Sequence, residues 1–150
     1  MDQNQKIEEV LNAWLYLSMS VSNNRLVSDM PLNEAVICHL LYRNQLHCPD
    51  APLTATDLCR ATKMLKSQMN RTLQSMEDKG LIFRERSSLD KRQVYVFINH
   101  TSPLYQNMHE KALMLVEQFM SKIGLNKADD IIRLFTIIGD TADEITGHSS

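Results

Sequence analysis

One β-hairpin pattern stands in a chain whose apolar residues otherwise repeat at helical spacing, and this pattern restricts the possible folds most. Residues 81–83 can begin a first strand, and residues 93–98 alternate aliphatic residues with Tyr95 and Phe97. Between them, the polar segment RERSSLDKRQ of residues 84–93 predicts a turn rich in cations. A hairpin among helices predicts a mainly α chain with one small β element.

Helical periodicity covers most of the remaining sequence. Apolar residues three and four positions apart predict long helices over residues 4–22, 28–45, 104–123 and 131–145. Shorter helices are predicted over residues 54–61 and 66–79, and Gly80 is a natural end for the second of these. The segment 47–54 contains two prolines and predicts a loop.

The composition is that of a globular protein in a reducing compartment. A chain of 150 residues fits one domain or one compact unit with a dimerisation element, and its 43% hydrophobic residues can form a core. No apolar run reaches the roughly 18 residues of a membrane span, and the polar start does not resemble a secretory signal. The three cysteines, Cys38, Cys48 and Cys59, are an odd and widely spaced set. These features predict a cytoplasmic protein without disulfides or membrane contact.

The charge distribution separates a basic middle from acidic flanks. Residues 53–95 carry nine Lys and Arg against five Asp and Glu, a net charge of +4, whereas the remainder carries −6. A basic segment between acidic ones indicates a part that meets phosphate. Charge alone leaves open whether this is an ordinary variation of the surface.

Two short helices followed by a basic hairpin match a winged helix-turn-helix. In this motif the second helix enters the major groove of DNA and the wing reaches the neighbouring minor groove. At about 100° per residue, Met69, Leu73 and Met76 share one side of the second helix. The opposite side and its flanks carry groups that can contact base edges and phosphates, namely Ser67, Gln68, Asn70, Arg71, Gln74 and Asp78. A solvated helix face would look similar, so this face alone leaves both interpretations open.

The hairpin turn adds a second signal for DNA binding. Lys91 and Arg92 stand near the end of a ribbon that is narrow enough to follow a groove. Arginine is favoured in a narrow minor groove because the potential there is more negative and guanidinium loses its hydration readily. Asp90 can orient the Arg92 guanidinium through a charge-assisted hydrogen bond. The alternative is a polar hairpin with a surface ion pair of little energetic value.

The segment from Leu53 to Asn99 resembles the DNA-binding core of the MarR family of bacterial transcriptional regulators. The resemblance rests on the Leu-Thr start, on the helix exit MEDKGLI of residues 76–82, and on the wing motif Asp-Lys-Arg of residues 90–92 before an apolar strand. The order of the flanking helices also fits, so the resemblance covers nearly the whole chain. Lys63 stands where many members have a turn glycine, and Leu65 replaces a Ser or Thr N-cap.

The resemblance implies a fold, an assembly and a set of DNA contacts. The fold would be mainly α with a small β wing, in which a winged helix-turn-helix domain of residues 31–100 is flanked by dimerisation helices in residues 1–30 and 101–150. The homodimer would bind a pseudo-palindromic operator in double-stranded DNA, usually as a repressor. Together with the polar face, the resemblance implies recognition-helix contacts by Lys66, Ser67, Gln68, Asn70, Arg71 and Gln74. The implied wing contacts are Arg86, Ser88, Asp90, Lys91 and Arg92, with Arg92 in the minor groove.

Relatives commonly respond to small aromatic or phenolic effectors, which bind where the dimer helices meet the winged domain. Trp14, Tyr16, His39 and Tyr42 could line such a pocket, although core packing explains these residues at least as well. Other relatives sense oxidants or zinc. Cys48 beside His47 is the candidate for a redox response.

Metal binding and catalysis are not expected. The pairs Cys38-His39, His47-Cys48 and His109-Glu110 lack the spacing of known zinc motifs, so neither a metal nor a cofactor is predicted. The sequence also has no glycine-rich phosphate loop, metalloprotease motif or nucleophile elbow. A winged helix that binds protein instead of DNA would expose apolar residues beside Ser67 and Arg71, where the sequence has polar ones. We therefore predict a ligand-responsive DNA-binding regulator that is not an enzyme.

Overall fold

The computed structural model describes residues 2–24 and 30–147 of the chain. Residues 1 and 25–29 of the predicted segment 1–30, and residues 148–150 of the predicted segment 101–150, lie outside the described residues, as do positions 28 and 29 of the second predicted helix. The helices are α1 (Gln3–Asn24), α2 (Leu32–His47), α3 (Ala55–Thr62), α4 (Lys66–Asp78), α5 (Pro103–Ile123), the short 3₁₀ helix η1 (Leu125–Lys127) and α6 (Ala128–Ile145). The strands are β1 (Leu53–Thr54), β2 (Ile82–Arg86) and β3 (Val94–Ile98). This order confirms the predicted mainly α fold with a small β wing.

The three strands form one antiparallel sheet in the order β1-β3-β2. Strands β2 and β3 pair from Ile82 opposite Ile98 to Arg86 opposite Val94, and residues 87–93 connect them. The predicted loop 47–54 is wrong at its end, because Leu53 and Thr54 pair with Val96 and Tyr95 of β3. This pairing anchors the start of α3 to the base of the hairpin.

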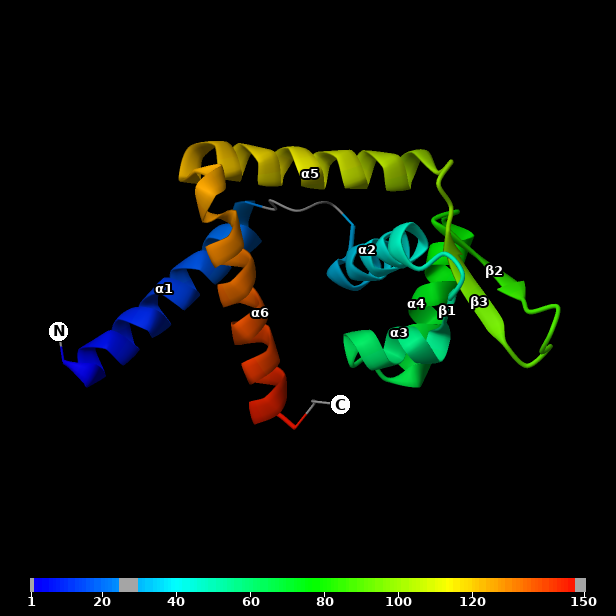
Figure 1. Cartoon of the computed structure of the whole chain (residues 1–150), viewed down its shortest axis with the longest axis horizontal. Coiled ribbons are helices and arrows are strands. Elements are labelled where there is room, and N and C mark those ends of the chain that lie inside the picture. The colour runs from blue at the N-terminus through cyan, green and yellow to red at the C-terminus, as the bar shows by residue number, and fades with distance from the viewer. Residues whose placement is uncertain (1, 25–29, 148–150) are drawn as a thin grey trace.

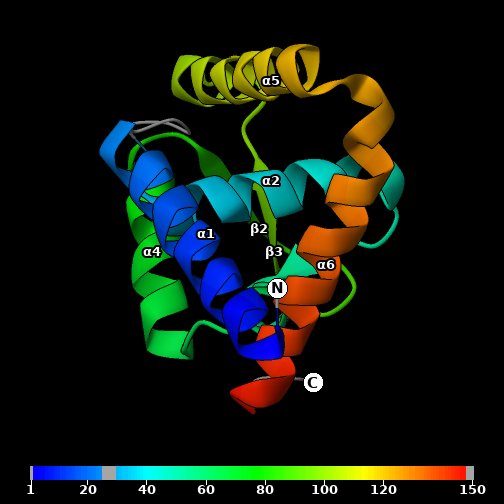
Figure 2. The same ribbon diagram turned by 90° about the vertical axis from the view of Figure 1, so that its left-hand side faces the viewer.

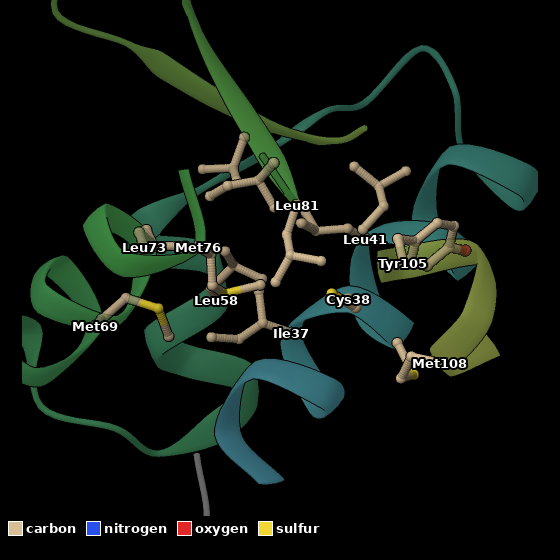
Figure 3. Packing of buried hydrophobic residues seen from close by; sticks show 13 residues of the cluster. Ile37, Cys38, Leu41, Leu58, Met69, Leu73, Met76, Leu81, Tyr105 and Met108 are labelled. Carbon is tan, nitrogen blue, oxygen red and sulfur yellow. The ribbon is translucent and has the colours of Figure 1, made fainter. Parts of the chain in front are cut away.

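The core lies where α2, α3, α4 and the sheet meet, and it forms because the apolar sides of these elements face one another (Figure 3). Met69, Leu73 and Met76 are fully buried, as the spacing along α4 predicts. Leu58 of α3 and Ile37 of α2 pack in the same cluster. The first turns of α5 close the core with Tyr105 and Met108.

The terminal helices stand apart from this core. In Figure 1, α5 extends across the top of the molecule, and α1 and α6 descend at the end opposite to the sheet. Figure 2 shows α1 and α6 in front of the rest. Their apolar stripes are largely exposed in the single chain, since Trp14 is 54% exposed and Phe135 is 64% exposed. In the described parts of the chain, no helix has the length and apolar character required to cross a bilayer.

Candidate nucleic-acid interface

The turn between α3 and α4 is built by local hydrogen bonds and one unusual backbone angle. Thr54 caps α3 in a capping box, in which its side chain accepts from the Asp57 N–H at 3.2 Å and the Asp57 carboxylate accepts from the Thr54 N–H at 2.9 Å. Lys63 ends α3 in the left-handed region with φ 63°, and among the described residues it is the one non-glycine with positive φ. Leu65 precedes α4 without a side-chain cap, as its residue type predicts.

The exposed side of α4 presents polar groups that are not bound by other described residues. Lys66, Ser67, Asn70 and Arg71 are exposed, and Gln68 is half-buried. Within the described ranges, none of these five side chains has a hydrogen-bond or ion-pair partner. The buried side of the helix fixes the direction of this face, because three apolar side chains hold α4 on the core. The polar groups are therefore available to an external partner.

Gln74 differs from the other predicted contacts of α4. Its carbonyl Oε1 accepts from Arg84 Nη2 at 2.9 Å, and its amide Nε2 donates to Asp78 Oδ1 at 3.0 Å. Arg84, on β2, also donates from Nε to Glu77 Oε2 at 2.6 Å. The structure thus joins Gln74 to the wing strand instead of leaving it open.

The turn of the wing is stiffened by its own hydrogen bonds. The Ser87 hydroxyl oxygen accepts from the N–H groups of Leu89 and Asp90, both at 3.2 Å. The Ser87 N–H donates to the Gln93 carbonyl at 2.8 Å, and the Gln93 N–H donates to the Asp90 carbonyl at 2.9 Å. The Arg86 guanidinium donates to the Lys91 carbonyl, and the Ser88 and Lys91 side chains are exposed. These bonds present the tip as an ordered projection beyond the sheet (Figure 1).

Arg92 lies beside Asp90 at the tip of the wing. Asp90 Oδ1 accepts from the Arg92 N–H at 3.0 Å and lies 3.6 Å from Arg92 Nε. The Arg92 side chain is nevertheless 95% exposed. The carboxylate therefore restrains the start of the side chain while the guanidinium remains open to solvent.

An ion pair between a buried carboxylate and a partly exposed lysine holds the end of α4 on α2, and no sequence pattern predicted it. The Glu34 carboxylate accepts two hydrogen bonds from Lys79 Nζ, at 3.0 and 2.9 Å. The Glu34 side chain is 8% exposed and the Lys79 side chain is 41% exposed. Glu34 interrupts the apolar side of α2, and an acid on a buried helix face is a sequence signal that could have indicated an ion pair. Its partner, 45 positions away, could not be read from spacing.

The four candidate effector residues occupy two different surroundings. Trp14 lines an open groove of about 540 Å³ between α1 and α6, together with Val10, Leu17, Phe135 and Ile138. Tyr16 is 75% exposed on α1. Tyr42 instead packs against the His109 ring of α5 at 4.7 Å, and His109 stacks on Tyr105 at 5.7 Å.

Titratable groups at the contact between α2 and α5 have pKa values that differ from their ordinary ones. Burial lowers the pKa of His39, and the charges of Arg43 and His109 lower it further. Burial raises the pKa of Tyr105 to about 12, with smaller contributions from Tyr42 and Cys38. The Tyr105 hydroxyl is buried and has no hydrogen-bond partner among the described residues.

The cysteines differ in accessibility, and no metal centre is evident. Cys38 is buried, Cys59 is half-buried and Cys48 is exposed. Burial, and next the Glu34 charge, raise the pKa of Cys38 to about 12, which disfavours the reactive thiolate. Within residues 2–24 and 30–147, no three His, Cys, Asp or Glu side chains are grouped as metal ligands would be.

Comparisons with known proteins agree on the fold. Residues 28–93 match the model of the MarR family. The transcriptional regulator BldR from Sulfolobus solfataricus is 19% identical with a TM-score of 0.62, and the alignment covers 92% of this chain and 97% of BldR. YusO from Bacillus subtilis is 13% identical with a TM-score of 0.59, and the alignment covers 95% of this chain and 99% of YusO. MepR from S. aureus bound to ethidium bromide is 15% identical with a TM-score of 0.55, and the alignment covers 87% of this chain and 95% of MepR. No curated protein matches the sequence significantly.

The two kinds of comparison support the same assignment. The family match spans α2, α3, α4 and the wing up to Gln93, which are the elements that carry the open polar face and Arg92. The structural alignments extend over the terminal helices as well. They confirm the predicted resemblance to the MarR family over residues 28–93 and show that the chain shares the fold of these solved structures.

Proposed function

We propose that this protein is a transcriptional regulator that binds a pseudo-palindromic operator as a homodimer, with α4 in the major groove and the wing in the adjacent minor groove. The observation that carries this proposal is the open polar face of α4 beside an ordered wing that presents Arg92. The side chains exposed on α4 are polar and offer donors or acceptors for base edges and phosphates, while exposed Leu65 stands just before the helix. This polar character favours DNA over protein as the partner.

The homodimer would use the terminal helices, residues 1–30 and 101–150. Large apolar side chains are exposed along α1, α5 and α6, including Trp14, Phe119 and Phe135. Exposed apolar surface of this extent marks an interaction site. A second copy would bury it and set the spacing of two recognition helices on a symmetric operator. The usual action in this family, repression released by an effector, is part of the proposal.

A small aromatic effector would bind near the contact between α2 and α5. The Tyr105 hydroxyl is buried without a hydrogen-bond partner among the described residues. The His109 ring stacks on Tyr105, Tyr42 packs against His109, and the exposed His39 is close enough to His109 for that charge to lower its pKa. A ligand with an aromatic ring and one polar group could stack on these rings and satisfy the hydroxyl. MepR bound to ethidium bromide, which has the same fold, supports an aromatic ligand in general. The apolar groove at Trp14 is the second candidate location.

The test compares two variants that each remove one positive charge. An operator would first be selected from random duplexes and its affinity measured at fixed salt. We expect Arg92→Ala to weaken binding by about 1–3 kcal/mol and to reduce the salt dependence, because the wing loses its groove contact. Lys127→Ala, in η1 away from the wing, should leave affinity close to wild type. Equal effects of the two substitutions would contradict the docking proposed here.

A further inference from the structure

Arg84 occupies an unusual position for a cation, on the inward side of a strand. Along β2, the Ile82 side chain is buried and Phe83 points outward to stack on Phe97 at 5.3 Å. Arg84 follows on the same side as Ile82, and its partner in the register, Val96, is buried. The Arg84 side chain is only 28% exposed. A guanidinium held against the core requires acceptors that replace its hydration.

Those acceptors come from two positions on successive turns of α4. Arg84 Nε donates to Glu77 Oε2 at 2.6 Å, and Nη2 donates to Gln74 Oε1 at 2.9 Å. Residues three apart lie on one face of a helix, so the planar guanidinium contacts two positions along the same side of α4. Because arginine has only donors, it also orients the Gln74 amide, whose Nε2 then reaches Asp78 Oδ1 at 3.0 Å.

We propose that Arg84, through Glu77 and Gln74, is a positioning residue that fixes the direction of the wing relative to the recognition helix. This inference rests on the proposed function. Among the described residues, no further strand lies beside the wing beyond Arg86 and Val94, since β1 reaches only Val96 and Tyr95 of β3. Operator binding requires α4 and the wing tip to meet two grooves at once, so a wing of fixed direction loses less conformational freedom on binding. Gln74 acts in this link and does not read a base.

The sign of a charge deletion distinguishes this role from a simple electrostatic effect. Glu77→Ala removes a negative charge near DNA, which by charge alone should strengthen binding to phosphate. If Glu77 holds Arg84 in place, the same substitution should instead weaken operator affinity by about tenfold, as for other coupled polar networks. Glu85→Ala is the matched control, because Glu85 is the next residue of β2 after Arg84, is exposed and forms no ion pair with any described residue. We expect Glu85→Ala to bind as well as wild type or better.

Arg84→Ala provides a second readout in the same assay. Its affinity should fall by a similar factor while the slope of log K against log salt stays unchanged, because Arg84 does not contact phosphate. If Arg84→Ala reduces the slope of log K against log salt by the amount expected for about one phosphate contact, the proposal is overturned. An operator affinity of Glu77→Ala equal to or above that of wild type would overturn it as well. Hydrogen exchange of β2 and β3 amides in the free protein should become faster in both variants, which keeps the link testable without DNA. If wild-type protein binds no duplex at low salt, the proposed function fails as well; if wild type binds and Glu77→Ala does not differ from it, this inference alone fails.

Discussion

The Glu34–Lys79 pair allows a stability prediction whose size follows from the structure. Lys79→Met would remove both hydrogen bonds to a carboxylate that is 8% exposed, and leave its charge buried without a partner. Breaking a buried ion pair in this way typically costs about 3–5 kcal/mol. The lower end of this energy range applies here for two reasons. The Lys79 side chain is 41% exposed, so water can reach the site. Glu34 also lies in the first turn of α2, where the helix dipole favours an anion. We expect a loss of about 3 kcal/mol in the free energy of unfolding.

The assay is urea unfolding followed by circular dichroism at one fixed protein concentration, because the stability of a dimer depends on concentration. In thermal unfolding, the same loss corresponds to a decrease in Tm of about 6–12 °C. The double variant Glu34→Met/Lys79→Met should recover most of the loss, since it leaves no charge in the site. Lys91→Met, at an exposed position of the wing, is the control and should change stability by less than about 0.5 kcal/mol. A single-variant loss below about 1 kcal/mol, or a double variant as unstable as the single one, would refute this reasoning.

Two further predictions concern the helix-turn-helix turn and the thiols. Lys63→Gly should stabilise the protein by about 0.5–1 kcal/mol in the same urea assay, because glycine adopts the left-handed conformation without the steric cost that lysine has there. The greater backbone entropy of glycine in the unfolded chain offsets only part of this gain. A less stable variant would show that φ 63° carries no strain. For the thiols, iodoacetamide at pH 8 should label exposed Cys48 first, as read by mass spectrometry. Cys38, whose pKa burial raises to about 12, should react only after unfolding, and early labelling of Cys38 would contradict its burial.

Local sequence signals predicted most of the fold. The apolar spacing in α4 indicated its buried side, and Met69, Leu73 and Met76 are buried there. The strand alternation and polar turn indicated the hairpin because a hairpin is a short-range structure. Strand β1 could not be predicted in this way, since two residues have no periodicity and their partners, Val96 and Tyr95, lie more than 40 positions away along the chain.

The candidate site was predictable in its composition but not in its internal contacts. Residue type and helical angle placed Ser67, Asn70 and Arg71 on an open face, because exposure follows directly from the orientation of α4. The engagement of Gln74 by Arg84 depends on how β2 packs beside α4, which no spacing along the chain encodes. For the same reason the sequence grouped Trp14 with Tyr42, whereas the structure places them in a groove between α1 and α6 and against His109 of α5.

Binding of this protein to DNA can be measured by fluorescence anisotropy on duplexes that tile the region upstream of its gene. Each duplex and a scrambled version of it would be titrated with wild-type protein at two salt concentrations. We predict saturable binding to one segment, tighter than to its scrambled version and steeply weakened by salt, because the interface combines base readout with phosphate contacts. The absence of binding to any duplex at low salt would contradict the account and would indicate that the polar face of α4 serves another partner.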